Sequence, residues 1–329
     1  MEKYFNSVRE IIKQGFLKNK LIKLSLKTLI TIGVGYYLYV NINFHEIVNQ
    51  ILNSNQYLLI TALLLGIMNI GLQYLKWKIT VNVVLEINNN KKIISSLLQG
   101  LAAAVSTPAR LGEYVGRAIP FADKSFLQVT LATLVDKFFS MLIVLVLGSL
   151  ASVFFIQVFY NVFEFITISL LILLLIFFYL IFLLLFNEKF WDNILFNKLK
   201  NSNRFGKYYN KFEVLKRLDK IYKSKMLILS FLFYLCVIVQ YSILVMAFSY
   251  NYHFLNYMWV GNLIMFTKTV IPPFTLGELG IRESASVYFI QRIGESADVG
   301  FNASIFLFII NIILPAVIGV IYQLRKNND

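Results

Sequence analysis

Six predominantly apolar stretches of roughly 20 residues run through the sequence, and each is long enough to cross a bilayer as an α-helix. They lie at 24–42, 57–77, 126–156, 162–186, 225–250 and 299–323. A mean hydropathy of +0.68, with only 15% charged residues, lies outside the usual range of soluble domains. The sequence therefore predicts an all-α polytopic membrane protein.

Two further apolar regions, at 95–120 and 257–293, are interrupted in the middle by proline, glycine and charged residues. The breaks are Thr107 and Pro108 in the first region, and Pro272 and Pro273 in the second. Each half is short for a full crossing. We expect each region to form a re-entrant helical hairpin whose broken backbone lies against protein or a watery cavity.

Lysine and arginine alternate between the gaps that separate these regions. They are frequent in 1–23 and in the connector 187–224, and absent from 43–56, 157–161 and 251–256. The alternation fits the positive-inside rule only if both hairpins return to the side they left. It predicts a multi-pass protein of a bacterial or archaeal cytoplasmic (inner) membrane, with both termini cytoplasmic. Orientation and attraction to anionic lipid explain the net charge of +14 better than nucleic-acid binding does.

The order span, hairpin, span occurs twice with opposite predicted insertion, which is typical of inverted repeats. The predicted organisation is a basic amphipathic cytoplasmic N-terminus (1–23), a first span with its external loop (24–56), repeat 1 (57–156), an additional span with a basic cytoplasmic connector (157–224), inverted repeat 2 (225–324) and a cytoplasmic tail (325–329).

Both breaks carry the motif P-x-x-x-G-E-x-x-x-R. The copies are Pro108, Gly112, Glu113 and Arg117 in one hairpin, and Pro273, Gly277, Glu278 and Arg282 in the other. Only five prolines occur in the whole chain, so a chance match of four fixed positions is improbable. Charged groups at membrane depth are costly and usually belong to a site or a pathway.

The motif predicts a half-helix that starts inside the membrane, with unpaired N–H groups that attract anions. Its glycine permits close approach of backbone or ligand, and its Glu and Arg share one helix face. The candidate substrate-binding residues are Arg110, Glu113, Arg117, Asp136, Glu278 and Arg282. The candidate structural breaks are Thr107, Pro108, Gly112, Pro272, Pro273 and Gly277.

A structural interpretation stays open beside the functional one. Thr107 and Pro108 resemble an N-cap followed by proline at the first helical position, and Glu113 with Arg117 can be a purely structural ion pair. Asp136 is expected either to bind an arginine of the hairpin or to line the cavity. The adjacent Lys137 cannot share its helix face and should contact a different partner.

The sequence offers no metal site of recognisable spacing and implies no cofactor. Its single cysteine, Cys236, falls inside an apolar run. Its two histidines, His45 and His253, lie in separate short gaps.

The segments 107–117 and 276–283 resemble the two signature stretches of the lysylphosphatidylglycerol synthase transmembrane family, whose members are also called flippase-like domain proteins. The resemblance covers nearly the whole chain in span order. It implies a membrane domain of the kind that moves aminoacylated phosphatidylglycerol, or in archaeal relatives polyprenyl-phosphate sugars, between leaflets. Phe274 and Thr275 stand where the family often has glycines. The soluble catalytic domain of the synthases does not follow the last span, so aminoacyl transfer is not expected.

These observations predict a transporter of a phosphate-containing lipid, either an anionic phospholipid or a polyprenyl-phosphate lipid, and not an enzyme. The arginines would hold the phosphate, and the glutamates would orient them or receive a cation or proton. Two alternatives remain open: an intramembrane lipid-phosphate transferase, and a non-transporting membrane protein that docks a partner through the basic connector. The oligomeric state and the identity of the lipid are left undetermined.

Overall fold

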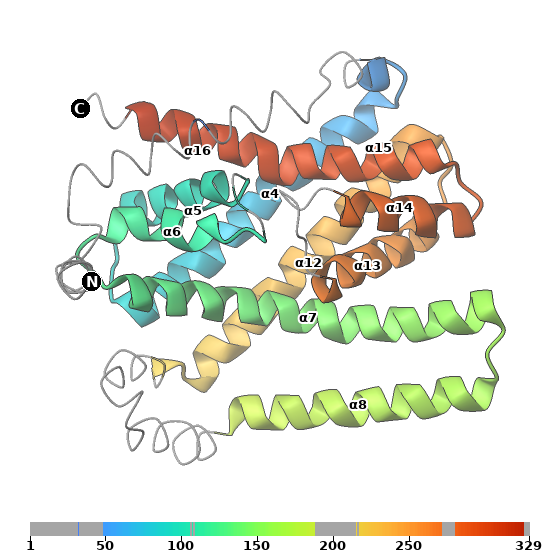
Figure 1. Cartoon of the computed structure of the whole chain (residues 1–329), viewed down its shortest axis with the longest axis horizontal. Coiled ribbons are helices and arrows are strands. Elements are labelled where there is room, and N and C mark those ends of the chain that lie inside the picture. Colours follow the sequence, from blue (N-terminus) through green and yellow to red (C-terminus); the bar gives the residue numbers. More distant parts are fainter. Residues whose placement is uncertain are drawn as a thin grey trace, which may run out of the picture.

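The computed structural model describes residues 32, 49–105, 107, 109–187, 215, 217–271 and 280–325, with side chains up to 322. Within these ranges the chain is helical and contains no strand (Figure 1). The predicted all-α class is confirmed. The expected first span, 24–42, and most of the basic connector lie outside the described residues.

Five described helical segments are long and apolar enough to cross a membrane. They are α4 (Gln56–Thr80) with its π-turn η2 (Val81–Leu85), α7 (Phe126–Tyr160), α8 (Glu164–Phe186), α12 (Lys220–Ser249), and α15 (Ala297–Phe308) continued through the π-turn η7 (Ile309–Ile313) into α16 (Leu314–Arg325). They match five of the predicted spans, so the multi-pass architecture is confirmed. The span expected at 57–77 ends too early, because the helix continues through the apolar residues of 81–85, about two turns further.

The first interrupted region folds into α5 (Asn90–Val105) and α6 (Gly112–Ala118), followed by the short 3₁₀ helix η3 (Ile119–Phe121). A Cβ added to Gly112 would lie 2.3 Å from the carbonyl oxygen of Ala103, and one added to Gly116 would lie 2.3 Å from that of Gln99. A step of four residues toward the C-terminus of α6, from Gly112 to Gly116, therefore corresponds to a step of four residues toward the N-terminus of α5, from Ala103 to Gln99. The two helices are antiparallel and so close that glycine is required where they touch.

The second interrupted region contains α13 (Phe254–Val270) and α14 (Ile281–Arg292), which pack against each other. Phe155 of α7 contacts the rings of Trp259, near the start of α13, and Phe289, near the end of α14. The start of one helix therefore lies beside the end of the other. Each interrupted region has the helical hairpin that the sequence predicts, although Pro108, Pro272, Pro273 and Gly277 lie outside the described residues.

The order long helix, helical hairpin, long helix thus occurs twice, first as α4, α5–α6 and α7, then as α12, α13–α14 and α15–α16 (Figure 1). The two units share extensive contacts, chiefly between α12 and α4 and between α16 and α5. The opposite insertion of the units in the membrane stays a prediction.

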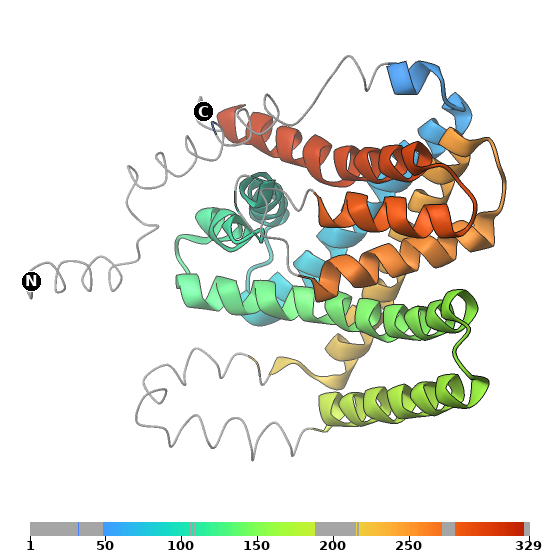
Figure 2. The ribbon, with the colours of Figure 1, turned by 45° about the vertical axis from the view of Figure 1, so that its right-hand side comes forward.

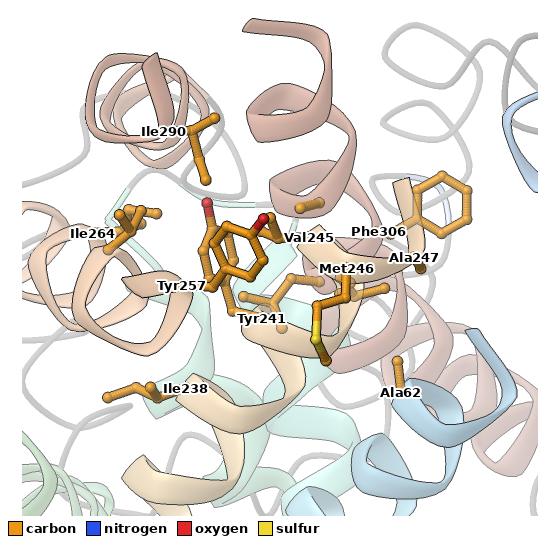
Figure 3. Packing of buried hydrophobic residues seen from close by; sticks show 14 of the residues in the cluster. Ala62, Ile238, Tyr241, Val245, Met246, Ala247, Tyr257, Ile264, Ile290 and Phe306 are labelled. Carbon is orange, nitrogen blue, oxygen red and sulfur yellow. The ribbon is translucent and has the colours of Figure 1, made fainter. Parts of the chain in front are cut away.

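Two large groups of buried apolar side chains hold the units together. One is centred on α5, α4 and η7, and includes Trp77, Leu101 and Phe308. The other is centred on α12, α13 and α15, and includes the fully buried Tyr241 and Tyr257 (Figure 3). Because both groups draw on helices from both halves of the chain, the two units form one body.

Helix α7 begins at a capping box, in which Ser125 and Gln128 satisfy each other's backbone N–H groups, and it continues for 35 residues. Helix α8 returns along it at the edge of the molecule (Figure 2). Only Thr167 and Leu185 of α8 are buried, and most of its other apolar side chains are exposed. An apolar helix with so much uncovered surface is expected to face lipid.

Candidate functional site

Arg117 lies at the centre of a buried ionic cluster between α4, α6 and α7. Its Nη2 is 2.8 Å from Glu113 Oε1, one helical turn earlier on α6, and its Nη1 donates to Asp136 Oδ2 of α7 at 2.9 Å. The guanidinium also lies 4.3 Å from the ring centroid of Trp77, within cation–π range. One arginine thus joins the hairpin to both neighbouring long helices.

Glu113 has two further cationic partners. Lys137 Nζ, from α7, donates to Glu113 Oε2 at 2.7 Å, and Arg110 Nη2 lies 3.4 Å from the same oxygen. The carboxylate is almost completely buried, with 3% of its side chain exposed. Three positive groups therefore surround one carboxylate, as expected where a buried charge must be paired.

Lys76 of α4 completes the cluster on the side of Asp136. Its Nζ is 3.7 Å from Asp136 Oδ1, donates to the backbone oxygen of the same residue at 3.3 Å, and contacts the hydroxyl of Ser140. It also lies 5.4 Å from the ring centroid of Phe233 in α12. Only 5% of this lysine side chain is exposed.

The described cluster holds four basic side chains, Lys76, Arg110, Arg117 and Lys137, against two carboxylates, Glu113 and Asp136. Such an excess inside a membrane protein favours an anion as an additional partner. Within the described residues, Asp136 Oδ1 and Arg117 Nε make no hydrogen bond, so the cluster is not fully satisfied internally.

The packing of α6 on α5 fixes where Glu113 and Arg117 point. Gly112 and Gly116 allow α6 to touch the α5 backbone, and a Cβ on Gly100 of α5 would lie 2.5 Å from Arg117 Cγ. The hydroxyl of Ser96 in α5 donates to the backbone oxygen of Arg117 at 2.7 Å, and it accepts from Trp77 Nε1 at 3.2 Å. The sequence predicted that the motif glycine permits close approach, and the partner proves to be the hairpin's own backbone.

Two expectations about the first break are wrong. Ala109 and Arg110 adopt left-handed backbone conformations, so α6 begins at Gly112 and not at Pro108. Thr107 is therefore no ordinary N-cap, although its hydroxyl does accept the N–H of Gly112 at 2.7 Å. The N–H groups of Glu113 and Tyr114 also donate within the loop, to backbone oxygens. The start of α6 is already satisfied by protein, so any attraction for an anion comes from the side chains.

The second motif places Arg282 at the start of α14, where it is 2% exposed. It pairs with Glu283, which also accepts the N–H of Gly280 at 2.7 Å, and its Nε donates to Ser304 of α15 at 3.1 Å. Glu278 lies outside the described residues. Among the described residues, the carboxylate that pairs with Arg282 is the adjacent Glu283.

The arginines of the two motifs each lie over an aromatic ring, and both rings belong to the same hydrophobic cluster. Arg282 lies 4.8 Å from the ring centroid of Phe308, and Arg117 lies over Trp77. Phe308 and Trp77 both belong to the buried cluster around α5. The motifs of the two units are thus connected through one packed core.

The structure confirms several expected contacts of the first motif. Glu113 and Arg117 form an i,i+4 pair, Asp136 binds an arginine of the hairpin, and Lys137 has a partner different from that of Asp136. Substrate binding by these residues stays a prediction, as it does for Arg110, Glu278 and Arg282.

Sequence reasoning missed Lys76, which lies one residue before the end of the predicted span 57–77. The apolar residues of 81–85 are the signal that could have placed it inside the helix, because they extend the span beyond it. The roles of Trp77, Ser96 and Ser140 in the cluster have no such signal, since they depend on tertiary packing.

The fold and the site define an all-α polytopic membrane protein with a buried, cation-rich ionic cluster beside a broken helical hairpin. The sequence model of the family described as "Lysylphosphatidylglycerol synthase TM region" matches residues 24–319. The chain belongs to this family, as its two signature segments predict. A search of curated proteins and a search of solved structures each returned no match.

Proposed function

We propose that the protein moves a phosphate-containing lipid between the leaflets of a bacterial or archaeal cytoplasmic membrane, with the buried ionic cluster as its head-group site, and that it catalyses no reaction there. The observation that carries the proposal is the gathering of four basic side chains, two of them buried and two partly exposed, around the buried carboxylates of Glu113 and Asp136. A phosphate supplies the missing negative charge, and arginine presents the paired donors that suit it.

In the proposed mechanism the lipid phosphate exchanges places with a carboxylate of the cluster. Arg117 binds Glu113 and Asp136 with separate nitrogens, so it can release one while holding the other. Lys137 and Lys76 lie on different helices from Arg117, and each contacts the carboxylate oxygen that Arg117 does not, Glu113 Oε2 and Asp136 Oδ1 respectively. Movement of one repeat relative to the other would then expose the site to each leaflet in turn.

Leaflet-resolved transport tests the proposal. Protein reconstituted into vesicles should equilibrate a fluorescent anionic phospholipid across the bilayer, measured as the fraction that a membrane-impermeant quencher reaches over time. Glu113→Gln combined with Glu278→Gln should slow this exchange about tenfold, because the first change weakens the charge-assisted contacts of Glu113 and the second removes the matching carboxylate of the other motif. A parallel set of vesicles with a labelled polyprenyl phosphate distinguishes the two lipid classes.

The matched control is Glu86→Gln with Glu164→Gln, since both of these glutamates are exposed and neither contacts a cluster residue in the described contacts. This control should transport at the rate of the unaltered protein. Exchange no faster than in protein-free vesicles would contradict the proposal, as would an unimpaired Glu113→Gln, Glu278→Gln variant.

The proposed orientation, with both termini cytoplasmic, predicts the labelling of the two ends of α7. Asp123 lies just before the start of α7 and Asn161 just after its end, and both are exposed. In a Cys236→Ala background, Asn161→Cys should react with an impermeant maleimide on intact cells, and Asp123→Cys only after permeabilisation. The reverse pattern would overturn the orientation, and reaction of both from one side would show that α7 does not cross.

A further inference from the structure

An apolar groove opens between α7, α8 and α12, and no charged or polar residue lines it. Its volume is about 420 Å³, and three side chains of α7, three of α8 and four of α12 form its walls. The lining residues include Ile143 of α7, Phe182 of α8 and Leu232 of α12. The volume falls in the range of about 300–1,000 Å³ that is usual for small-molecule sites.

The groove belongs to the membrane-embedded part of the molecule. All three helices are long and apolar enough to span a bilayer, and α8 is exposed along most of its length. Leu232 and Ile228 of α12 are themselves 43% and 61% exposed. The groove is therefore open to hydrocarbon, and the candidate ligand is an apolar chain.

The groove also adjoins the ionic cluster. Asp136, Ser140 and Ile143 follow one another on a single face of α7, at the spacing i, i+4 and i+7. Lys76 contacts Asp136 and Ser140, and its ammonium lies 5.4 Å from the ring centroid of Phe233. Phe233 directly follows Leu232 of the groove wall. The basic edge of the cluster and the apolar groove are about one helical turn apart.

We propose that this groove binds one fatty acyl chain of an anionic phospholipid, whose phosphate lies at the Lys76 side of the ionic cluster. The inference rests on the proposed lipid transport for the head group and adds a site for the chain. A single unbranched chain suits a cavity at the small end of the usual range. A polyprenyl chain is longer and methyl-branched, and it requires more volume. Selection among lipids would then involve the chain as well as the head group.

Photolabelling tests the proposal directly. The probe is a phosphatidylglycerol with a diazirine in one acyl chain, added to phosphatidylcholine vesicles that contain the protein. Label should concentrate on the groove walls of α7, α8 and α12 and should saturate as the probe increases. Leu232→Trp fills the groove, and the crowding should lower this labelling about tenfold.

The matched control is Leu173→Trp, the same substitution at a position of α8 that is 62% exposed and does not line the groove. It should leave the groove labelling unchanged. Ile228→Trp is a second groove-filling variant and should act like Leu232→Trp. Because both groove positions are partly exposed, the larger side chain can occupy the groove without entering the packed core, and the fold should survive, as a single symmetric elution peak would show.

Label spread evenly and without saturation over the exposed surface of α8 would show ordinary boundary lipid and would overturn the inference. So would unchanged labelling in both tryptophan variants, saturation by a polyprenyl-phosphate probe alone, or a disulfide between two copies through Leu232→Cys in the Cys236→Ala background. If the protein transports lipid but its labelling does not saturate, only the proposed acyl-chain site is contradicted. If labelling saturates but the protein does not transport lipid, the acyl-chain site stands and the proposed transport function is contradicted.

Discussion

Arg117→Gln is expected to lower the free energy of unfolding by about 3–5 kcal/mol and to abolish lipid exchange, because the change leaves two buried carboxylates without their shared cation. Glu113 and Asp136 both bind this guanidinium, and the side chain is only 4% exposed. Lys137 and Lys76 remain beside the two carboxylates, which places the expected loss toward the lower end of the range. Denaturant unfolding in detergent micelles, followed by far-UV circular dichroism, measures the loss.

Arg292→Gln is the matched control. Arg292 also lies over aromatic rings, those of Tyr160 and Tyr288, but it is exposed and has no carboxylate partner among the contacts described. Its replacement should cost about 1 kcal/mol or less. Equal losses in the two variants would show that the buried ion pairs add nothing to stability.

A double variant separates charge from packing. If the loss in Arg117→Gln comes from uncompensated carboxylates, adding Asp136→Asn should recover about 1 kcal/mol or more, since neighbouring groups couple by amounts of this order. Lipid exchange should not recover, because the proposed phosphate site would still lack its arginine. Recovery of exchange together with stability would mean that Arg117 is purely structural.

The second large effect is expected at the glycines of the first hairpin. Gly116→Ala should destabilise the protein by roughly 3 kcal/mol, near the upper end of overpacking costs. The added Cβ would lie 2.3 Å from the Gln99 carbonyl oxygen, so one helix must move away from the other. That movement displaces Arg117, the next residue, and lipid exchange should fall with stability.

Gly71→Ala offers a control with the opposite expected sign. No heavy atom lies within 4 Å of the position its Cβ would take on α4, and alanine is the better helix former by up to about 1 kcal/mol. The variant should be as stable as the unaltered protein or slightly more so. If Gly116→Ala unfolds at the same denaturant concentration as Gly71→Ala, then α5 and α6 are not held at the distance described.

Much of the fold could be predicted from the sequence, because a helix that crosses a bilayer must be apolar over roughly 20 residues. Apolar length predicts five of the described spanning segments, and prolines with glycines predict where 95–120 and 257–293 break. Boundaries were less accurate: α5 starts at Asn90, since its first turn is polar and carries no apolar signal. The predicted span 57–77 stops before Lys78, whereas the helix continues to Leu85.

Only the part of the site that belongs to the repeated sequence motif, or lies next to it in the helix order, could be predicted. The repeated motif identified Glu113, Arg117 and Arg282, and adjacency on one helix predicted different partners for Asp136 and Lys137. Backbone conformation at Ala109 and Arg110 was not predictable, because left-handed non-glycine residues depend on the surrounding structure. The partner of Arg282, which proved to be Glu283, was likewise decided by packing at the start of α14.

The length of α7 links the depth of the ionic cluster to the thickness of the membrane. Its 35 residues extend about 52 Å, well beyond a hydrocarbon layer of about 30 Å, so the helix must tilt or project from the bilayer. Asp136 lies ten residues from the helix start at Phe126, and its distance from either surface therefore changes with the tilt. Bilayers of shorter or longer lipids should set different tilts, which makes the host membrane's own composition a regulator of how readily the site is reached.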